Sequence, residues 1–363
     1  MTVTIRAAVV RERGAPLRIE EVQLDAPRPN EVLVRLVSAG ICRSDEHALA
    51  EVEPPAVLGH EGAGVVEAVG SEITKVEPGD AVVMTFASCG SCPRCQRGEP
   101  AYCDRFLELN FSGRRLDGTS ALSSRGEAIA GHFLGQSCFA THAIVSERSV
   151  VRVATPVDLG ALGPFGCGFQ TGAGAVLNAF APSPGTSLAV FGAGAVGLAA
   201  IAAAAMVGCS PIIASDVIGS RLELAKRFGA TDVLQARSQE TVAALRNIVS
   251  GGLDFAIDTT GNAQVVRDAV ASLNTRGSLG VIGAGSSDEI VLDWRTILNG
   301  RTVTGIIAGN SVPDVFLPRL IDLYRSGRLP VDELIEYFPF EEINEAIEAS
   351  RQGKVIKPVL MFD

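Results

Sequence analysis

A glycine-rich turn between a short apolar strand and an alanine-rich helix constrains the fold more than any other feature of the sequence. The strand is predicted over residues 187–191 and the helix over residues 196–207, with Gly192, Gly194 and Gly197 at the turn in a G-x-G-x-x-G pattern. The first glycine makes the tight turn, the second lets the backbone approach a pyrophosphate, and the third lets the helix pack on the strand. The N-terminus of the helix then faces the phosphates. A glycine triplet alone is a weak signal, but this one lies between the elements that its mechanism needs, so it predicts a dinucleotide-binding unit.

An acidic residue supports the same interpretation. The second strand is predicted over residues 211–216 and ends in Asp216, at about the distance from the glycine turn where such units carry a ribose-binding acid. A carboxylate there accepts hydrogen bonds from the ribose hydroxyls and repels a 2′-phosphate, which predicts NAD in place of NADP. The alternative is a purely structural turn followed by a solvated aspartate. The match of both motif and spacing disfavours that alternative.

Predicted strands and helices divide the chain into parts of different character. The first third contains short β-branched strands, which predict a barrel-like β domain with functional loops. The middle alternates strands with helices, which predicts a parallel sheet covered by helices on both faces. The elements expected besides those already named are strands at 32–37, 64–69, 81–84, 255–258, 278–282 and 358–362, and helices at 221–228 and 316–326. The closing strand is expected to rejoin the first domain.

The segment Leu159–Ser215 contains no Lys, Arg, Asp or Glu, and therefore needs a test as a membrane span. A spanning helix requires about 20 consecutive apolar residues, whereas Pro182, Pro184 and Gly185 interrupt this run. The segment is predicted to be buried protein interior, with no membrane partner. The net charge of −10 provides no basic field for nucleic acid. Because the N-terminus lacks the apolar core of a signal peptide, a cytoplasmic location is expected.

Four of the eight cysteines are clustered in one short segment. They are Cys89, Cys92, Cys95 and Cys103. This spacing lets one loop wrap a tetrahedral ion, and four thiolates leave no open coordination position. The sequence therefore predicts a structural zinc site, in preference to four reduced surface cysteines.

A catalytic zinc needs fewer protein ligands and one open position. The remaining sulfur and imidazole candidates are Cys42, Cys138, Cys167, Cys209, His47, His60, His132 and His142. Cys42, His60 and Cys167 lie in loops, where sites positioned by a scaffold tend to form. The residues alone do not join these three, and for any one of them a buried cysteine or a hydrogen-bonded histidine is the simpler interpretation.

Taken together, the motifs resemble those of the zinc-dependent medium-chain alcohol dehydrogenases over essentially the whole chain. The matching stretches are GICRSDEH, LGHEGAGVVEAVG, CGSCPRCQRGEPAYC, FLGQSCFATHAIV, GCGFQTGAGAVLN, FGAGAVG with Asp216, and GKVIKPVLMF. The resemblance implies an α/β plus β fold, with a GroES-like catalytic domain over 1–168 and 309–363 and an inserted Rossmann domain over 169–308. It also implies two zinc ions per subunit, NAD, and a homodimer or homotetramer in which edge strands near 303–307 pair across subunits.

The resemblance implies specific roles around the metal. Cys42, His60 and Cys167 would hold the catalytic zinc, with water or the alcohol oxygen in the fourth position. Glu61 would lie behind the metal and bind it transiently. Asp45 would orient the histidine ligand, as acids behind metal-bound histidines do.

Further residues are implied in proton transfer. Ser44 would take the alcohol proton and pass it through the cofactor ribose to His47 near solvent. The alternative for His47 is an ordinary exposed histidine, with water in its place. Zinc would lower the pKa of the alcohol, and the hydride would pass to the nicotinamide.

Three basic residues are implied at the cofactor. Arg43 and Lys357 would neutralise the pyrophosphate, and Arg221 would assist Asp216 at the ribose. For Arg43 and Lys357 the alternative is a solvated surface charge, the usual fate of such residues.

The substrate is the least defined part of the prediction. Thr85, Phe86, Phe133 and Leu134 fall where family members line the substrate pocket, although each of these residues also suits the core. Their apolar character predicts a small hydrophobic primary alcohol, and the chain resembles the aryl- and benzyl-alcohol dehydrogenase branch most. Three alternatives remain open: a thiol-dependent formaldehyde dehydrogenase, a non-catalytic NAD-binding zinc protein of the same fold, and a zinc-free quinone reductase. The cysteine loop and the complete set of candidate zinc ligands argue against the last.

Overall fold

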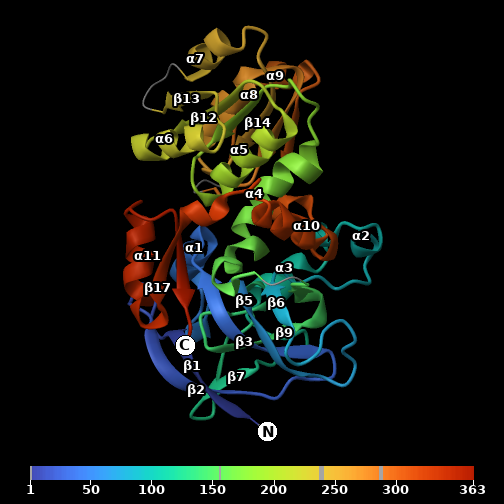
Figure 1. The fold of residues 1–363 in the computed structure, drawn as a ribbon, viewed down its shortest axis with the longest axis vertical. Helices are drawn as coiled ribbons and strands as arrows, with labels where there is room; N and C mark the ends of the chain where they lie inside the picture. The colour runs from blue at the N-terminus through green and yellow to red at the C-terminus, as the bar shows by residue number, and fades with distance from the viewer. Residues whose placement is uncertain (1, 155–156, 237–240, 286–288) are drawn as a thin grey trace. The chain divides into compact units, whose positions relative to one another are not determined.

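The computed structural model describes residues 2–154, 157–236, 241–285 and 289–363. The chain forms two compact units: Met1–Gly168 with Val312–Asp322 and Asp332–Asp363, and Phe169–Ser311 with Leu323–Val331 (Figure 1). A single return to the first unit at residue 309 was expected. Instead, residues 309–311 and Leu323–Val331 belong to the second unit, because helix α10 (Pro313–Arg325) begins in one unit and ends in the other.

The second unit is built on a parallel sheet, as predicted. Its order is β13-β12-β11-β14-β15-β16, and all neighbouring strands pair in parallel. The strands are β11 (Leu188–Phe191), β12 (Ile212–Asp216), β13 (Asp232–Gln235), β14 (Leu253–Asp258), β15 (Leu273–Val281) and β16 (Thr302–Gly305). The four residues of β11 are all buried, which is typical of a strand covered on both faces. This is the doubly wound order of a Rossmann fold.

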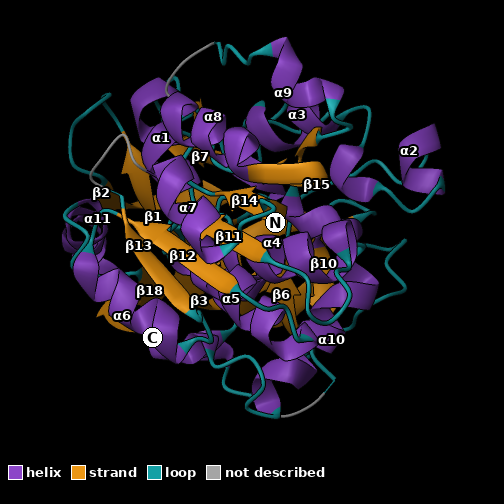
Figure 2. Cartoon of the chain, turned by 90° about the horizontal axis from the view of Figure 1, so that it is seen from above, coloured by secondary structure: helices purple, strands orange, loops and turns teal. Residues whose placement is uncertain are grey.

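Helices alternate with these strands along the chain (Figure 2). They are α4 (Gly168–Gly174), α5 (Ala195–Val207), α6 (Gly219–Arg227), α7 (Thr241–Ile248), α8 (Ala263–Ser272) and α9 (Trp294–Leu298). Helix α5 is apolar on all sides and nine of its residues are buried, so it is an interior helix. Leu245 of α7 and Val266 of α8 pack into one apolar cluster with Phe191 of β11. The charge-free stretch of the sequence is accounted for by this buried interior.

The first unit contains two largely antiparallel sheets. One has the order β4-β1-β2-β7-β8 and the other β10-β6-β5-β3-β18-β17, with β9 paired to β3. The first comprises β1 (Val3–Val10), β2 (Arg18–Leu24), β4 (Ala56–Val57), β7 (Leu122–Ser124) and β8 (Glu127–Ile129). The second comprises β3 (Glu31–Gly40), β5 (Glu61–Val69), β6 (Ala81–Met84), β9 (His142–Ser146), β10 (Val150–Arg152), β17 (Ile335–Pro339) and β18 (Lys357–Met361). Buried apolar residues from the strands of both sheets form one shared core.

The C-terminal strand β18 completes the second sheet. It pairs antiparallel with β3, where Leu360 lies opposite Ala39, and parallel with β17. This pairing brings Lys357, the first residue of β18, to the end of β3. The tail therefore rejoins the first domain, as expected from the sequence.

Short helices in the first unit carry the loops that matter for function. They are α1 (Arg43–Glu51), α2 (Pro93–Gln96), α3 (Phe106–Phe111), α11 (Ile343–Arg351) and the 3-10 turns Phe133–Gly135 and Gly163–Gly166. Helix α1 directly follows β3, while α2 and α3 belong to the cysteine-rich loop and the segment after it. Across the described ranges, no helix combines the length and the apolarity needed to span a membrane.

Candidate metal centre

Four side chains that can bind a metal meet at the strand ends of the first unit. The ligand atoms of Cys42, His60, Glu61 and Cys167 lie within 4.8 Å of one another. Cys42 is the N-cap residue of α1, His60 directly precedes β5, and Cys167 ends the Gly163–Gly166 turn. Loops held by rigid strands therefore bring together three residues that are distant in sequence. The resemblance had placed these three residues together at the metal, which the sequence pattern alone could not do.

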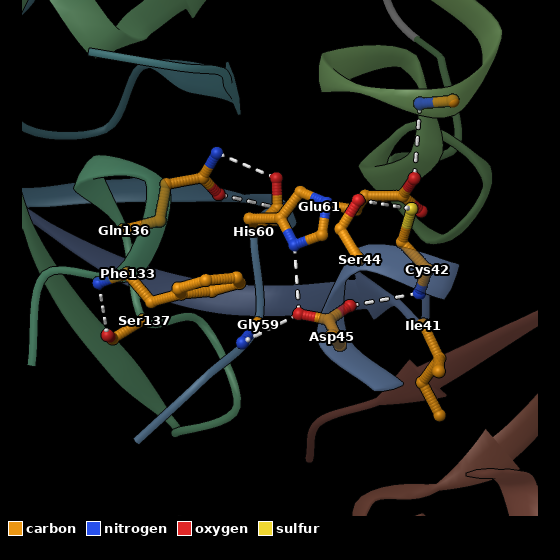
Figure 3. A network of polar contacts seen from close by, with 12 residues as sticks. Ile41, Cys42, Ser44, Asp45, Gly59, His60, Glu61, Phe133, Gln136 and Ser137 are labelled. Atoms are coloured by element: carbon orange, nitrogen blue, oxygen red, sulfur yellow. Dashed lines mark hydrogen bonds and ion pairs between the residues drawn. The ribbon is translucent and has the colours of Figure 1, made fainter. Parts of the chain in front are cut away.

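Asp45 holds the imidazole of His60 in one orientation (Figure 3). Its Oδ1 lies 2.8 Å from Nδ1 of His60 and accepts a bond from the backbone N–H of Gly59, while Oδ2 accepts the backbone N–H of Cys42. Because the carboxylate accepts, Nδ1 carries the proton and Nε2 keeps a free lone pair. Among the residues that the structure describes, Nε2 is buried and has no hydrogen-bond partner. Such an orphaned acceptor beside two sulfurs fits a metal ligand.

The electrostatics of the cluster suit a bound cation. A hydrogen bond from Cys167 and the nearby His60 hold the pKa of the Cys42 thiol well below its usual value, although burial acts in the opposite direction. Burial lowers the pKa of His60, but Asp45 and Cys42 outweigh it and raise that pKa well above its usual value. The first shift favours a thiolate at Cys42, and the second favours positive charge at His60, which a metal ion at Nε2 would supply in place of a proton. Two sulfurs and one imidazole form a donor set that zinc accepts.

Glu61 is the carboxylate of this cluster and is paired with Lys357. The Nζ atom of Lys357 lies 2.8 Å from Oε2 and 3.1 Å from Oε1 of Glu61, and it donates to the carbonyl of Ile41 at 3.0 Å. Both side chains are almost completely buried. Space for the carboxylate exists because residue 40 is glycine: a Cβ atom on Gly40 would lie 2.1 Å from Oε2.

This pairing shows that Lys357 is not a solvated surface charge. The lysine was expected to neutralise a pyrophosphate, with a solvated charge as the alternative. Its three donors reach Glu61 and a backbone carbonyl. Burial lowers the pKa of Lys357, but Glu61 and Cys42 raise it above its usual value, so the amine is charged.

Gln136 is a supporting residue that sequence reasoning missed. Its Oε1 accepts the backbone N–H of Gly62 at 3.2 Å and its Nε2 donates to the carbonyl of His60 at 2.7 Å. The side chain is buried, so these bonds fix the start of β5 from the side opposite Asp45 (Figure 3). The available signal was a single amide inside the otherwise apolar FLGQSCFATHAIV stretch.

Helix α1 carries the residues implied in proton transfer. The Oγ atom of Ser44 lies 3.9 Å from Sγ of Cys42, and His47 lies one turn further along the helix. Both residues are exposed, so the face they share connects the cluster with solvent. Arg43 is also exposed, and its Nη1 atom lies 3.3 Å from Oε2 of Glu46.

The four clustered cysteines form a second metal-binding group. Their sulfurs all lie within 4.8 Å of one another, with Cys89–Cys95 at 4.0 Å and Cys92–Cys103 at 3.9 Å. A tetrahedral zinc with bonds of about 2.3 Å has sulfur–sulfur edges of about 3.8 Å. Backbone N–H groups point at the sulfurs, including Cys89 N to Cys103 Sγ at 3.3 Å. The arrangement fits a closed structural zinc site.

The residues proposed for the substrate pocket differ in their surroundings. The ring of Phe133 meets the His60 ring edge-on, with centroids 5.5 Å apart. Phe86 is buried, and its ring centroid lies 6.0 Å from that of Phe106. Thr85 is fully buried and donates to the carbonyl of Gly166 at 2.9 Å. Leu134 has a left-handed backbone (φ 48°) within the Phe133–Gly135 turn.

In the second unit the glycine turn has the geometry that the motif requires. Gly192 has φ +94°, and a Cβ on Gly197 would lie 1.8 Å from the carbonyl oxygen of Gly192. A Cβ on Gly194 would meet nothing within 4 Å, which leaves open space beside the backbone at the middle glycine. These three environments correspond to a tight turn, a close helix–strand contact and room for a phosphate.

Asp216 ends β12 beside this turn. Its Oδ2 accepts the N–H of Ala193 at 2.7 Å and its Oδ1 accepts the N–H of Ile218 at 2.9 Å. Each carboxylate oxygen retains a lone pair for a ribose hydroxyl. Arg221 follows on α6, and among the described residues its Nε is buried without a hydrogen-bond partner.

Comparisons with known proteins agree with this architecture. Residues 28–155 match the family model described as an alcohol dehydrogenase GroES-like domain, and residues 195–325 match that of a zinc-binding dehydrogenase. The chain is 40% identical to geraniol dehydrogenase of Castellaniella defragrans, over 99% of this chain and 98% of that protein. An alcohol dehydrogenase zinc-binding domain protein from Burkholderia ambifaria superposes with a TM-score of 0.97 and 44% identity, with both chains fully covered. Benzyl alcohol dehydrogenase from Acinetobacter calcoaceticus superposes with a TM-score of 0.95 and 40% identity, covering 99% of this chain and 100% of that one.

Proposed function

Because this chain belongs to the zinc-dependent medium-chain alcohol dehydrogenases, we propose that it oxidises a hydrophobic primary alcohol of the aryl or allylic type to its aldehyde. Membership in this family implies zinc and NAD as cofactors. The observation that carries the proposal is the buried, unpartnered Nε2 of His60, oriented by Asp45 toward two cysteine sulfurs. The two similar dehydrogenases named for geraniol and benzyl alcohol support this class of alcohol.

Cys42, His60 and Cys167 would hold the catalytic ion. Three protein ligands leave one coordination position for the substrate. A zinc ion bound there supplies Lewis acidity, which lowers the pKa of an alcohol hydroxyl. Glu61 is held behind these residues by Lys357, while Asp45 and Gln136 keep the histidine segment in place.

Ser44 and His47 would move the proton. Ser44 Oγ lies 3.9 Å from Cys42 Sγ, close enough to the ligand cluster to accept a proton from a hydroxyl bound beside it. His47 is exposed one helical turn away, and it would pass the proton to solvent. The chain thereby provides a proton path along a single face of α1.

Gly192, Gly194, Gly197 and Asp216 would bind the dinucleotide. When bound, NAD accepts the hydride from the substrate carbon. The carboxylate of Asp216 would bind the adenosine ribose and repel a 2′-phosphate. Arg221 has an unpartnered buried Nε, within the described residues, that is available for the same nucleotide. We therefore propose NAD in preference to NADP.

The apolar surroundings of the cluster support the proposed substrate class. Phe133 packs edge-on against His60, one of the proposed zinc ligands. Phe86, two residues after the end of β6, is also buried. Aromatic rings favour contact with flat apolar groups. A sugar would find few hydrogen-bonding partners on these side chains.

The direct test is oxidation by zinc-replete protein with NAD or NADP, followed as reduced cofactor. Benzyl alcohol and geraniol are compared with ethanol, hexanol, and formaldehyde plus a thiol. We expect benzyl alcohol and geraniol to exceed ethanol in kcat/KM, with NAD preferred. Turnover of the thiol adduct alone would instead assign a thiol-dependent formaldehyde dehydrogenase. No turnover of any substrate would contradict catalysis and favour a non-catalytic role.

A further inference from the structure

A row of aromatic rings extends from the candidate zinc ligand His60 to the protein surface. Its members are Phe133, Phe111, Phe106 and Phe86, of which Phe106 and Phe111 begin and end helix α3. We propose that the rings of Phe106 and Phe111 form the outer wall of the alcohol site and that Phe111 selects alcohols with a large, flat apolar group. This inference rests on the proposed alcohol oxidation and adds the residues that determine its specificity.

The inner end of the row is buried against the metal cluster. Phe133 meets the His60 ring at 5.5 Å with an interplanar angle of 82°, and both side chains are buried. An alcohol whose oxygen lies beside His60 therefore has Phe133 as a neighbour for its carbon chain. A short alcohol such as ethanol ends there.

Phe111, in the middle of the row, is its exposed member. The centroid of the Phe111 ring lies 6.0 Å from that of Phe133, with an angle of 74° between the ring planes, and 6.3 Å from that of Phe106. Phe111 nevertheless remains 52% exposed, which leaves much of a large apolar ring without a partner from the described chain. A flat aryl or allylic group that extends past Phe133 would cover this ring and gain edge-to-face or stacked contacts.

A buried asparagine fixes the position of α3. Asn110 is fully buried, and its Oδ1 accepts the N–H of Ala87 at 2.8 Å. Its Nδ2 donates to the carbonyls of Ala87 at 3.0 Å and Phe106 at 2.8 Å. Ala87 directly follows Phe86, so these bonds attach helix α3 to the segment that contains Phe86. Asn110 is therefore a positioning residue for Phe106 and Phe111.

The substrate is a better occupant of this surface than a second copy of the chain. The row is continuous with the ligand cluster through direct ring contacts, whereas a docking surface needs no connection to a zinc ligand. Only one ring of the row, Phe111, exceeds half exposure. A stable protein interface requires a much wider apolar area.

The test compares Phe111→Ala with Leu107→Ala, a matched apolar truncation on the same helix at a residue that is 74% exposed. For Phe111→Ala we expect kcat/KM for geraniol and benzyl alcohol to fall by about tenfold, mainly through KM, because one large apolar contact is lost. The value for ethanol should change by less than about twofold. Leu107→Ala should leave both values near those of the unchanged protein.

A binding measurement separates this inference from the proposed function. Saturation-transfer NMR of benzyl alcohol without NAD should show weaker contact in Phe111→Ala than in Leu107→Ala, whether or not the protein turns over. Three results would each contradict the proposed role of Phe111. They are equal losses of kcat/KM for ethanol and geraniol, equal binding of benzyl alcohol in both variants, and a changed oligomeric state with unchanged selectivity. Failure of the unchanged protein to oxidise any alcohol would contradict the proposed function instead.

Asn110 provides a second variant for the same inference. Asn110→Asp keeps the acceptor for Ala87 N–H but removes both donors and places charge against two carbonyls. We expect it to reduce the geraniol-to-ethanol ratio in the same direction as Phe111→Ala, with zinc content unchanged. A loss of kcat for both alcohols without a change in their ratio would show a structural role alone.

Discussion

The ammonium group of Lys357 lies 2.8 Å from Oε2 of Glu61, although 296 residues separate them in the chain. Both side chains are buried, so each compensates the charge of the other in a site without solvent. Lys357→Met would leave the carboxylate unpaired. We expect this variant to lose about 3–5 kcal/mol of unfolding free energy, measured by urea denaturation.

The double variant Lys357→Met with Glu61→Gln is the control, because it removes both charges. It should recover most of the lost stability. The same proteins test the earlier idea of a phosphate contact. If Lys357→Met stays as stable as the unchanged protein but binds NAD about tenfold more weakly, the lysine belongs to the pyrophosphate after all.

Asp45→Asn is expected to weaken zinc at the candidate catalytic site. An amide does not hold the Nδ1 proton as a carboxylate does, so His60 would lose its fixed tautomer and orientation. Losses of this kind reduce metal affinity or activity by about 10–100-fold. Zinc per subunit, measured by atomic emission after dialysis against a weak chelator, should fall toward one ion as the four-cysteine site keeps its own.

The partly exposed pair of His142 and Glu67 provides the matched comparison for that variant. Nε2 of His142 lies 3.1 Å from Oε2 of Glu67, away from either metal-binding group. Glu67→Gln should leave zinc content and activity unchanged. Equal zinc loss in both variants would show that Asp45 has no special role.

Much of the fold was predictable because local patterns determined it. The glycine turn, the buried strand before it and Asp216 all lie within one βαβ unit, and the parallel sheet with helices was confirmed. The four-cysteine loop was equally visible, since its ligands lie within one short segment. When all residues of a site lie within one short segment, their spacing in the sequence is enough to predict the site.

The candidate catalytic site was less predictable because its parts are distant in sequence. Cys42, His60 and Cys167 were joined only by family resemblance, and their meeting depends on the end of β3, the start of β5 and the Gly163–Gly166 turn. The contact of Lys357 with Glu61 was not predicted because it exists only after β18 pairs with β3. Gln136 has no spacing signal, since it acts on the backbone of a different strand.

His132 should make stability depend on pH. Burial, followed by the charge of Arg115, lowers the pKa of His132 to about 4, with Arg28 acting in the same direction and Glu31 and Asp117 opposing it. The unfolded imidazole binds a proton below about pH 6.5, whereas the folded one does not until about pH 4. Stability is therefore lost as the pH falls through this window, by about 3 kcal/mol for this residue.

The measurement is urea denaturation at pH values from 7 to 4, for the unchanged protein and for His132→Gln. The difference between the two curves isolates the histidine, because other acid-titrating groups are common to both. We expect the variant to lose less stability on acidification. Parallel curves would mean that His132 is not buried as a neutral group.

Asp216→Asn should weaken the preference for NAD. The change removes the negative charge that would repel a 2′-phosphate, while the amide oxygen can still accept a backbone N–H. We expect the NAD-to-NADP ratio of kcat/KM to fall by at least about tenfold, equivalent to ~1.4 kcal/mol. Asp232→Asn, on the neighbouring strand β13, is the control and should leave the ratio unchanged.

The edge strand β16 should mediate assembly of the subunits. It lies at the end of the parallel sheet, and all four of its residues are exposed, including Val303 at 40%. Trp294 and Leu298 of α9 add large exposed apolar side chains, at 64% and 68%. An exposed edge strand is a template for pairing with another chain, so we propose that two copies join through β16 and that the protein is a homodimer or a tetramer of such pairs. Lysine on an edge strand opposes this pairing, so Val303→Lys should reduce the molar mass measured by light scattering by half.

Val315→Lys, at a residue 71% exposed on α10, makes the same change outside this edge and should leave the molar mass unaltered. An unchanged molar mass in both variants, or a protein that is monomeric without any substitution, would rule out assembly through β16.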